Sequence, residues 1–180
     1  MTTSWEDERL PARLPVRPLE GRFALSDAAL SAAESLLPTF RGPDGDHEGL
    51  IYFLGVERPR DTLLVAAAAP DADHGPRWVR ASQAAILAMT QEAHRNGLAV
   101  LSQLHSHPGG WTEHSVGDDD KVLMPFEGML SFVAPHYGRF GLRPIDGLGV
   151  HQWQDGRWVA CGRESIRDGI RVIPSKLDLR

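Results

Sequence analysis

The sequence has little that would suit an exported, membrane-spanning or nucleic-acid-binding protein. Cys161 is the only cysteine among 180 residues, so no intramolecular disulfide can form, and a reducing compartment is indicated. No apolar run reaches the roughly 18 residues that a membrane-spanning helix needs. Acidic residues outnumber basic ones by 24 to 19, which argues against nucleic acid as a partner. The first residues lack the layout of a signal peptide, so we expect a cytoplasmic protein without membrane contact.

The chain is expected to form one folded domain with an extension at each end. At 180 residues it is long enough to bury a sizeable core, and it shows no repeats. Residues 1–21 contain three prolines and many charges, which predicts an extended N-terminal arm or an irregular element at the edge of the sheet. Residues 163–180 are charged and carry no clear pattern, which predicts a C-terminal tail. The domain itself is therefore expected over residues 22–162.

Strand and helix patterns alternate along this domain. A helix is predicted over residues 28–37 with Ser26 as its N-cap, and a second from Ser82 to a stop at Asn96. Residues 70–76 are expected to form a loop. Strands are predicted at residues 48–56, 62–68, 98–107, 128–134, 147–153 and 157–161. This order predicts an α/β fold in which a mixed β-sheet is flanked by helices.

Two histidines stand near the end of one predicted strand. Because His105 and His107 are two residues apart, their side chains project to the same face of an extended strand. Asp118, eleven residues after His107, can return as a third, anionic ligand. Two imidazoles and one carboxylate, with a fourth position left to water, form the ligand set of a catalytic zinc site. Ser115, three residues before Asp118, also fits a helix capping box that would fix where Asp118 points.

Each half of this pattern also has a more ordinary interpretation. A His-x-His pair alone is more often structural or exposed than metal-binding, and most Ser-x-x-Asp sequences mark only the start of a helix. The two together, at this spacing, indicate a metal site. The segment His105-Ser-His-Pro108, followed by Ser115-x-x-Asp118, resembles the metalloprotease motif of the JAMM family, also called JAB or MPN+ domains. The resemblance implies the JAB/MPN fold, which is cytidine-deaminase-like, for the catalytic domain at residues 22–162.

The JAMM family also carries a catalytic glutamate at the start of an upstream strand, in the pattern Glu-x-x-Gly-x-x-x-Gly. Glu48 and Gly55 fall in register with the first and last positions of this pattern, whereas Ile51 stands at the middle glycine. The resemblance therefore implies Glu48 as the catalytic acid-base residue. Glu57 is the rival acid, but it lies out of register with the pattern.

The expected chemistry is the hydrolysis of an amide. A Zn²⁺ ion held by two neutral imidazoles and a carboxylate keeps a net positive charge, which lowers the pKa of bound water toward neutrality. Glu48 would take the proton of that water and pass it to the leaving amine. Ser115 would donate a hydrogen bond to the oxyanion. The resemblance implies an isopeptide or peptide bond just after the C-terminus of ubiquitin or a ubiquitin-like protein.

Two other functions stay open. A JAB peptidase of this kind can process a sulfur-carrier protein, and a metal-free MPN-type domain can act as an interaction scaffold only. The implied partners are a ubiquitin-like protein or its conjugates and, by analogy alone, E1-like or E2-like proteins of the same bacterial operon, including antiphage operons. Outside the motif, His114 is expected to be an exposed loop residue more often than a channel residue. His47 would point away from the site, and nothing in its spacing supports Cys161 as a nucleophile.

Overall fold

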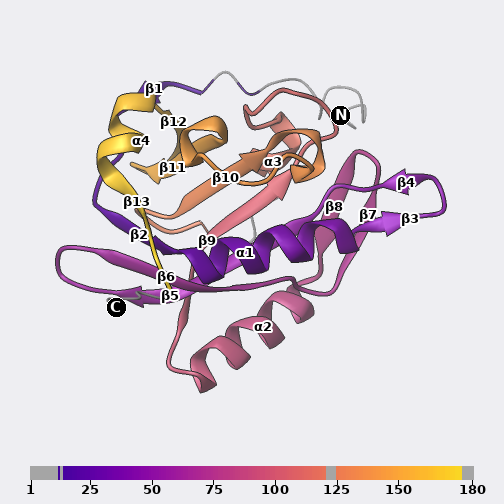
Figure 1. Ribbon diagram of the computed structural model, residues 1–180, viewed down its shortest axis with the longest axis horizontal. Helices are drawn as coiled ribbons and strands as arrows, with labels where there is room; N and C mark the ends of the chain where they lie inside the picture. Colours follow the sequence, from indigo (N-terminus) through magenta and orange to yellow (C-terminus); the bar gives the residue numbers. More distant parts are fainter. Residues whose placement is uncertain (1–11, 13, 121–124, 176–180) are drawn as a thin grey trace, which may run out of the picture.

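The computed structural model describes residue 12, residues 14–120 and residues 125–175, which form one large mixed sheet with helices on both of its faces (Figure 1). The strands are β1 (Val16–Arg17), β2 (Phe23–Ser26), β3 (Arg41–Gly42), β4 (Gly45–Asp46), β5 (Leu50–Glu57), β6 (Thr62–Ala68), β7 (Ala72–Gly75), β8 (Trp78–Ala81), β9 (Ala99–Ser106), β10 (Leu130–Ala134), β11 (Gly149–Gln154), β12 (Arg157–Cys161) and β13 (Ile170–Ile173). The helices are α1 (Asp27–Leu36), α2 (Gln83–Arg95), α3 (Val116–Asp120) and α4 (Arg163–Gly169), with short 3₁₀ turns η2 (Leu37–Thr39), η3 (Pro135–Gly138) and η4 (Ile145–Gly147).

The strand order of the large sheet is β1-β12-β11-β10-β9-β5-β6-β2-β13. Strand β5 lies near the middle and pairs antiparallel with both β6 and β9. Strand β10 runs parallel to β9, whereas β11 returns antiparallel beside β10. The expectation of an α/β chain with a mixed sheet is therefore confirmed. Assignment to the JAB/MPN fold remains a prediction.

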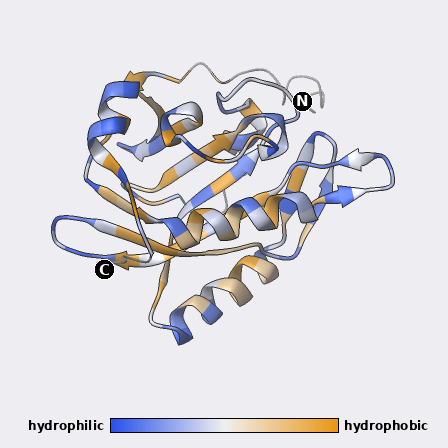
Figure 2. Ribbon diagram, in the orientation of Figure 1, coloured by the Kyte–Doolittle hydropathy of each residue, from blue (hydrophilic) through white to orange (hydrophobic). Residues whose placement is uncertain are grey.

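Alternate residues of β5 pack into two different hydrophobic clusters, one on each face of the sheet. Ile51 and Phe53 are buried in the cluster that includes Leu30 of α1. Tyr52 and Leu54 point to the opposite face and pack in the cluster that includes Met89 of α2. This period of two is what a strand buried on both faces requires. Figure 2 shows apolar residues along the central strands, and polar residues at the β5–β6 turn and on the β3–β4 hairpin.

Several predicted boundaries are confirmed. Ser26 caps α1, because its hydroxyl oxygen accepts a hydrogen bond from the backbone N–H of Ala29 at 3.1 Å. Ser82 caps α2 in the same way, and α2 ends with Asn96 as its C-cap. Strand β6 covers the predicted residues 62–68. These features depend on residues close in sequence, which is why the pattern alone could predict them.

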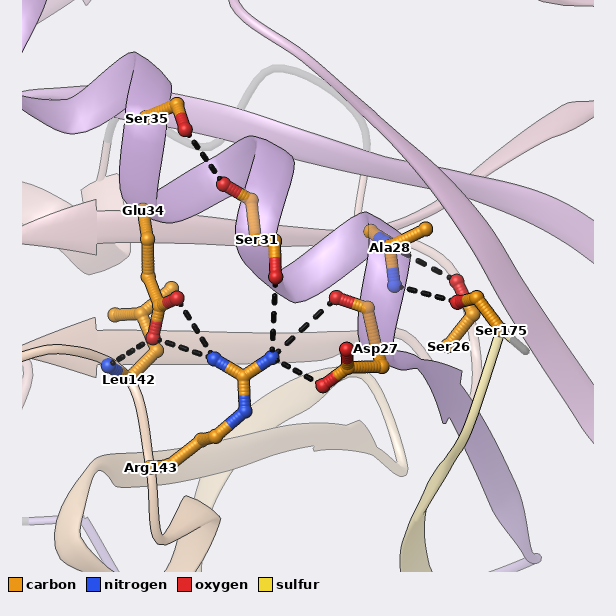
Figure 3. Close-up of polar contacts among 10 residues, drawn as sticks. Ser26, Asp27, Ala28, Ser31, Glu34, Ser35, Leu142, Arg143 and Ser175 are labelled. Carbon is orange, nitrogen blue, oxygen red and sulfur yellow. Dashed lines mark hydrogen bonds and ion pairs between the residues drawn. The ribbon is translucent and has the colours of Figure 1, made fainter. Parts of the chain in front are cut away.

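Arg143 fixes the loop after η3 to α1 at both its first and its last turns (Figure 3). Its guanidinium pairs with Glu34 at 2.7 Å and with Asp27 at 2.6 Å. Glu34 also accepts a hydrogen bond from the backbone N–H of Leu142 at 2.9 Å. At the start of the same helix, the backbone N–H of Ala28 donates to the hydroxyl of Ser175, just beyond β13. Helix α1 is therefore tied to two segments that are far away in sequence.

Two expectations differ from the structure. Residues 163–173, predicted as part of a C-terminal tail, form α4 and β13, and β13 pairs in parallel with β2. Within the predicted loop 70–76, residues 72–75 are β7, which pairs with β8. Strand β13 is an edge strand of only four residues, too short for an alternating pattern to reveal it from the sequence. Part of residues 1–21 forms β1, an edge strand that pairs with β12, which agrees with the expected element at the edge of the sheet.

Residues 1–11 and 13 of the predicted arm, and residues 176–180 of the predicted tail, lie outside the described residues. Across the described part of the chain, no helix has both the length and the apolar character needed to cross a membrane.

Candidate metal centre

His105 and His107 meet at the end of β9. His105 pairs with Leu50 of β5 on one side and with Val133 of β10 on the other, so the sheet fixes its position. His107 follows the strand and is held by a hydrogen bond from its backbone N–H to the carbonyl oxygen of Ala134 at 2.9 Å. Both rings are buried, and their Nε2 atoms lie 3.2 Å apart. The strand alternation predicted from the sequence therefore does bring the two imidazoles together.

Asp118 reaches the same point from α3. Its Oδ2 lies 3.3 Å from Nε2 of His105 and 3.3 Å from Nε2 of His107. The same oxygen accepts a hydrogen bond from the backbone N–H of Ser115 at 2.7 Å, while the Ser115 hydroxyl accepts one from the backbone N–H of Asp118 at 3.1 Å. These reciprocal bonds form a capping box. The capping box and the His105–His107–Asp118 cluster thus use one carboxylate.

The protonation of these groups suits a divalent cation. One ligand atom from each of His105, His107 and Asp118 lies within 4.8 Å of the others. Burial alone would raise the pKa of Asp118, but His105 and His107 hold that pKa well below its usual range. Burial lowers the pKa of His107, even though Asp118 acts against this shift. Near neutral pH the cluster therefore offers a carboxylate and a neutral imidazole, the forms that bind a metal.

Glu48 lies just before β5, beside the end of β9. The backbone N–H of Gly49 donates to the hydroxyl of Ser106 at 2.9 Å, and the backbone N–H of Ser106 donates to the carbonyl oxygen of Gly49 at 3.1 Å. Leu50 pairs with His105, so alternation directs Glu48 to the same face as that ligand. Glu48 is buried. The pKa of Tyr137 is raised mainly by burial of its ring, and the charge of Glu48 is the next largest cause.

The rival acid Glu57 lies at the other end of β5, where it is exposed and pairs with Thr62. Of the two candidates, only Glu48 is therefore on the same edge of the sheet as His105. The catalytic roles of Glu48 and Ser115 remain predictions.

His114 is fully buried, which corrects the expectation of an exposed loop histidine. Its ring stacks on His151 of β11 with centroids 3.9 Å apart, and its Nε2 lies 2.9 Å from the hydroxyl of Ser131. His151 was not among the candidate residues found from the sequence. The only signal that could have identified it was its position on the inward face of β11.

The pair His114 and His151 predicts a strong loss of stability in acid. Burial, with His105 as the next cause, lowers the pKa of His114 to about 3, and burial beside His114 lowers the pKa of His151 well below its usual range. Both rings stay neutral in the folded protein, whereas the unfolded chain takes up protons below about pH 6.5. The stabilisation is therefore complete above that pH and decreases as the pH falls.

Between pH 7 and pH 5 we expect each histidine to lower the free energy of unfolding by about 2 kcal/mol. Urea unfolding of the protein in a chelating buffer measures this change without a contribution from metal release. The variant His151→Phe should show roughly half of the pH dependence that these two residues cause. Equal stability of the wild-type protein at both pH values would contradict the prediction.

The fold and the site together define a class of protein: a mixed α/β domain that carries a buried His-His-carboxylate cluster. No protein-family model matches the chain. The chain is 31% identical over 101 residues to a protein of Sinorhizobium fredii named probable metalloprotease y4jG. The match covers 52% of this chain and 59% of that protein, so the chain spans about three fifths of the length of the curated relative it matches.

The fold is similar to the solution structure of protein DSY2949 from Desulfitobacterium hafniense. The two share 14% sequence identity at a TM-score of 0.59, over 85% of this chain and 94% of the other. At this low identity the likeness shows a shared fold alone. The sequence similarity to a probable metalloprotease and the three converging ligand groups are therefore the two findings that bear on function.

Proposed function

We propose that this protein is a zinc-dependent peptidase of the JAMM type that cleaves just after the C-terminus of a ubiquitin-like protein. The observation that carries the proposal is the position of Asp118 Oδ2, 3.3 Å from the Nε2 atoms of both His105 and His107. The relative named a probable metalloprotease supports the peptidase class. The ubiquitin-like substrate rests on the resemblance of the His-x-His-Pro and Ser-x-x-Asp motif to that family.

His105, His107 and Asp118 would hold the ion. A bound zinc ion supplies a positive charge that makes water nucleophilic near neutral pH and polarises the scissile carbonyl group. Glu48 accepts the proton of the attacking water and returns it to the nitrogen of the leaving amine. The Ser115 hydroxyl already accepts a hydrogen bond from the backbone of Asp118, so its own proton is left to be donated to the carbonyl oxygen of the substrate.

Removal and return of the metal test the proposal. We expect the purified protein to hold one zinc ion per chain and to release a fluorescent amine attached to the C-terminal glycine of ubiquitin or of a ubiquitin-like sulfur carrier. A chelator such as 1,10-phenanthroline should abolish this release, and added Zn²⁺ should restore it. Because strand pairing holds His105 and the capping box holds Asp118, circular dichroism of the chelated protein should still show its fold.

The ratio of kcat/KM for the ubiquitin substrate to kcat/KM for the sulfur-carrier substrate distinguishes a deubiquitinase-like enzyme from one that processes a sulfur-carrier protein. A protein that binds no zinc and cleaves neither substrate would be an interaction scaffold, and the proposal would be wrong. A protein that binds zinc and hydrolyses other amides, but neither of these, would keep the metalloenzyme class and lose the ubiquitin-like substrate.

A further inference from the structure

His114 is a fully buried polar residue that is not one of the three converging ligand groups. Its ring lies near the ring of His105 on β9, at a centroid distance of 5.5 Å, and makes contacts with three further strands of the sheet. Nε2 lies 2.9 Å from the hydroxyl of Ser131 on β10, and the ring stacks on His151 of β11. Its third neighbour is the indole of Trp158 on β12, edge-on at a centroid distance of 5.1 Å. Burying a polar ring costs free energy unless its hydrogen bonds are satisfied. The ring of His114 must therefore keep the position in which it reaches these partners.

Ser131, the hydrogen-bond partner of His114, belongs to a row of polar residues that crosses the sheet from β9 to β11. Gln103, Ser131 and His151 are directly paired on β9, β10 and β11, so their side chains share one face. The Gln103 amide donates to the Ser131 hydroxyl at 3.1 Å. The Ser131 hydroxyl keeps its own proton and can donate it to Nε2 of a His114 ring that is protonated on Nδ1. Because His105 is two residues beyond Gln103 on β9, this row and the metal ligand share one rigid strand.

His114 is also the residue directly before Ser115 and the capping box. Helix α3 begins at Val116, so the segment that ends at Ser115 sets where this helix starts. The segment before it is held at its backbone as well. The carbonyl oxygen of His114 accepts a hydrogen bond from the N–H of Ala12 at 2.7 Å. The carbonyl oxygen of Thr112 lies so close to Gly149 of β11 that a Cβ there would be only 1.8 Å away.

We propose that His114 is a positioning residue, whose buried ring ties the segment 108–115 to β10 and β11 and so sets where Ser115 and Asp118 stand relative to His105 and His107. The proposal deepens the proposed function, because it rests on the metal site formed by those residues. The low pKa of His114, about 3, agrees with this role, since burial keeps the ring neutral and able to accept from Ser131.

Three variants test the hydrogen bond without large changes in volume. His114→Phe keeps an aromatic ring for the stack on His151 but gives Ser131 no acceptor. His114→Gln offers an amide oxygen to Ser131, and Ser131→Ala removes only the hydroxyl. Zn²⁺ affinity is measured on each protein by competition with a chromophoric chelator, without substrate. Thermal unfolding, kcat and KM are measured in parallel. His94→Phe, on the exposed surface of α2, is the matched control.

We expect His114→Phe to weaken Zn²⁺ binding on the order of 10-fold, the lower end of what outer-shell partners contribute. The value of kcat should fall with little change in KM, because the substrate itself does not touch this buried ring. Ser131→Ala should give a similar loss, and the double variant should lose no more than either single variant, since both remove one hydrogen bond. His114→Gln should recover most of the affinity, and His94→Phe should match the wild type.

Folded His114→Phe or Ser131→Ala protein with wild-type Zn²⁺ affinity would overturn the positioning role. Additive losses in the double variant would also overturn it. If His114→Phe does not fold, Ser131→Ala alone decides the question. A wild-type protein that binds zinc tightly but cleaves no ubiquitin-like substrate would sink the proposed function and leave this inference intact. A wild-type protein that binds no zinc would refute both.

Discussion

Replacing Asp118 by asparagine is expected to remove the metal and the activity together. The asparagine amide keeps the size of the side chain and an oxygen that can accept from the backbone N–H of Ser115, so the start of α3 should survive. What is lost is a negative charge that contacts both imidazoles of the cluster. A neutral amide oxygen is a poor replacement for a carboxylate beside a divalent ion.

We expect Zn²⁺ affinity to fall by more than the roughly 10- to 100-fold that an outer-shell change costs. Turnover should fall to background. Metal content after dialysis and a chelator competition titration measure the first effect, and kcat/KM measures the second. Asp155→Asn is the matched control, because Asp155 lies at the exposed β11–β12 turn with 76% of its side chain accessible. An Asp118→Asn protein that keeps its zinc would remove Asp118 from the ligand set.

Replacing Glu48 by glutamine should separate catalysis from metal binding. The substitution is isosteric and keeps the backbone contact to Gly75, where the N–H of Glu48 donates at 2.9 Å. It removes the only group at this edge of the sheet to which we assign proton transfer. A positioned general acid-base residue contributes about 10²- to 10⁴-fold in rate, so kcat should fall by this factor. Zn²⁺ affinity should stay at the wild-type value, since Glu48 is not among the three converging ligand groups.

Single-turnover kinetics and a zinc titration of the same preparation measure both quantities. Glu57→Gln, at the exposed far end of β5, carries the same chemical change and should behave as wild type. Full turnover by Glu48→Gln would exclude Glu48 as the base. Joint loss of zinc and activity would instead place Glu48 among the groups that hold the ion.

The motif residues could be found from the sequence because their relation is local. His105 and His107 share a face through the period of a strand, and Ser115 and Asp118 are linked by the hydrogen-bond pattern of a helix start. The same reasoning located the Ser26 cap and the strand β6. Each of these features depends on residues only a few positions apart, and backbone geometry fixes what such neighbours can do.

The sequence by itself thus determined the mixed α/β class, three candidate ligands and one candidate acid. The tertiary structure alone decided that Asp118 Oδ2 lies at equal distance from both imidazoles, and that β13 joins the sheet. It also decided that His114 is buried against His151. These outcomes come from contacts between segments far apart in the chain, which form only when the strands pair and exclude water. A periodicity within one segment carries no information about which distant segment will cover it.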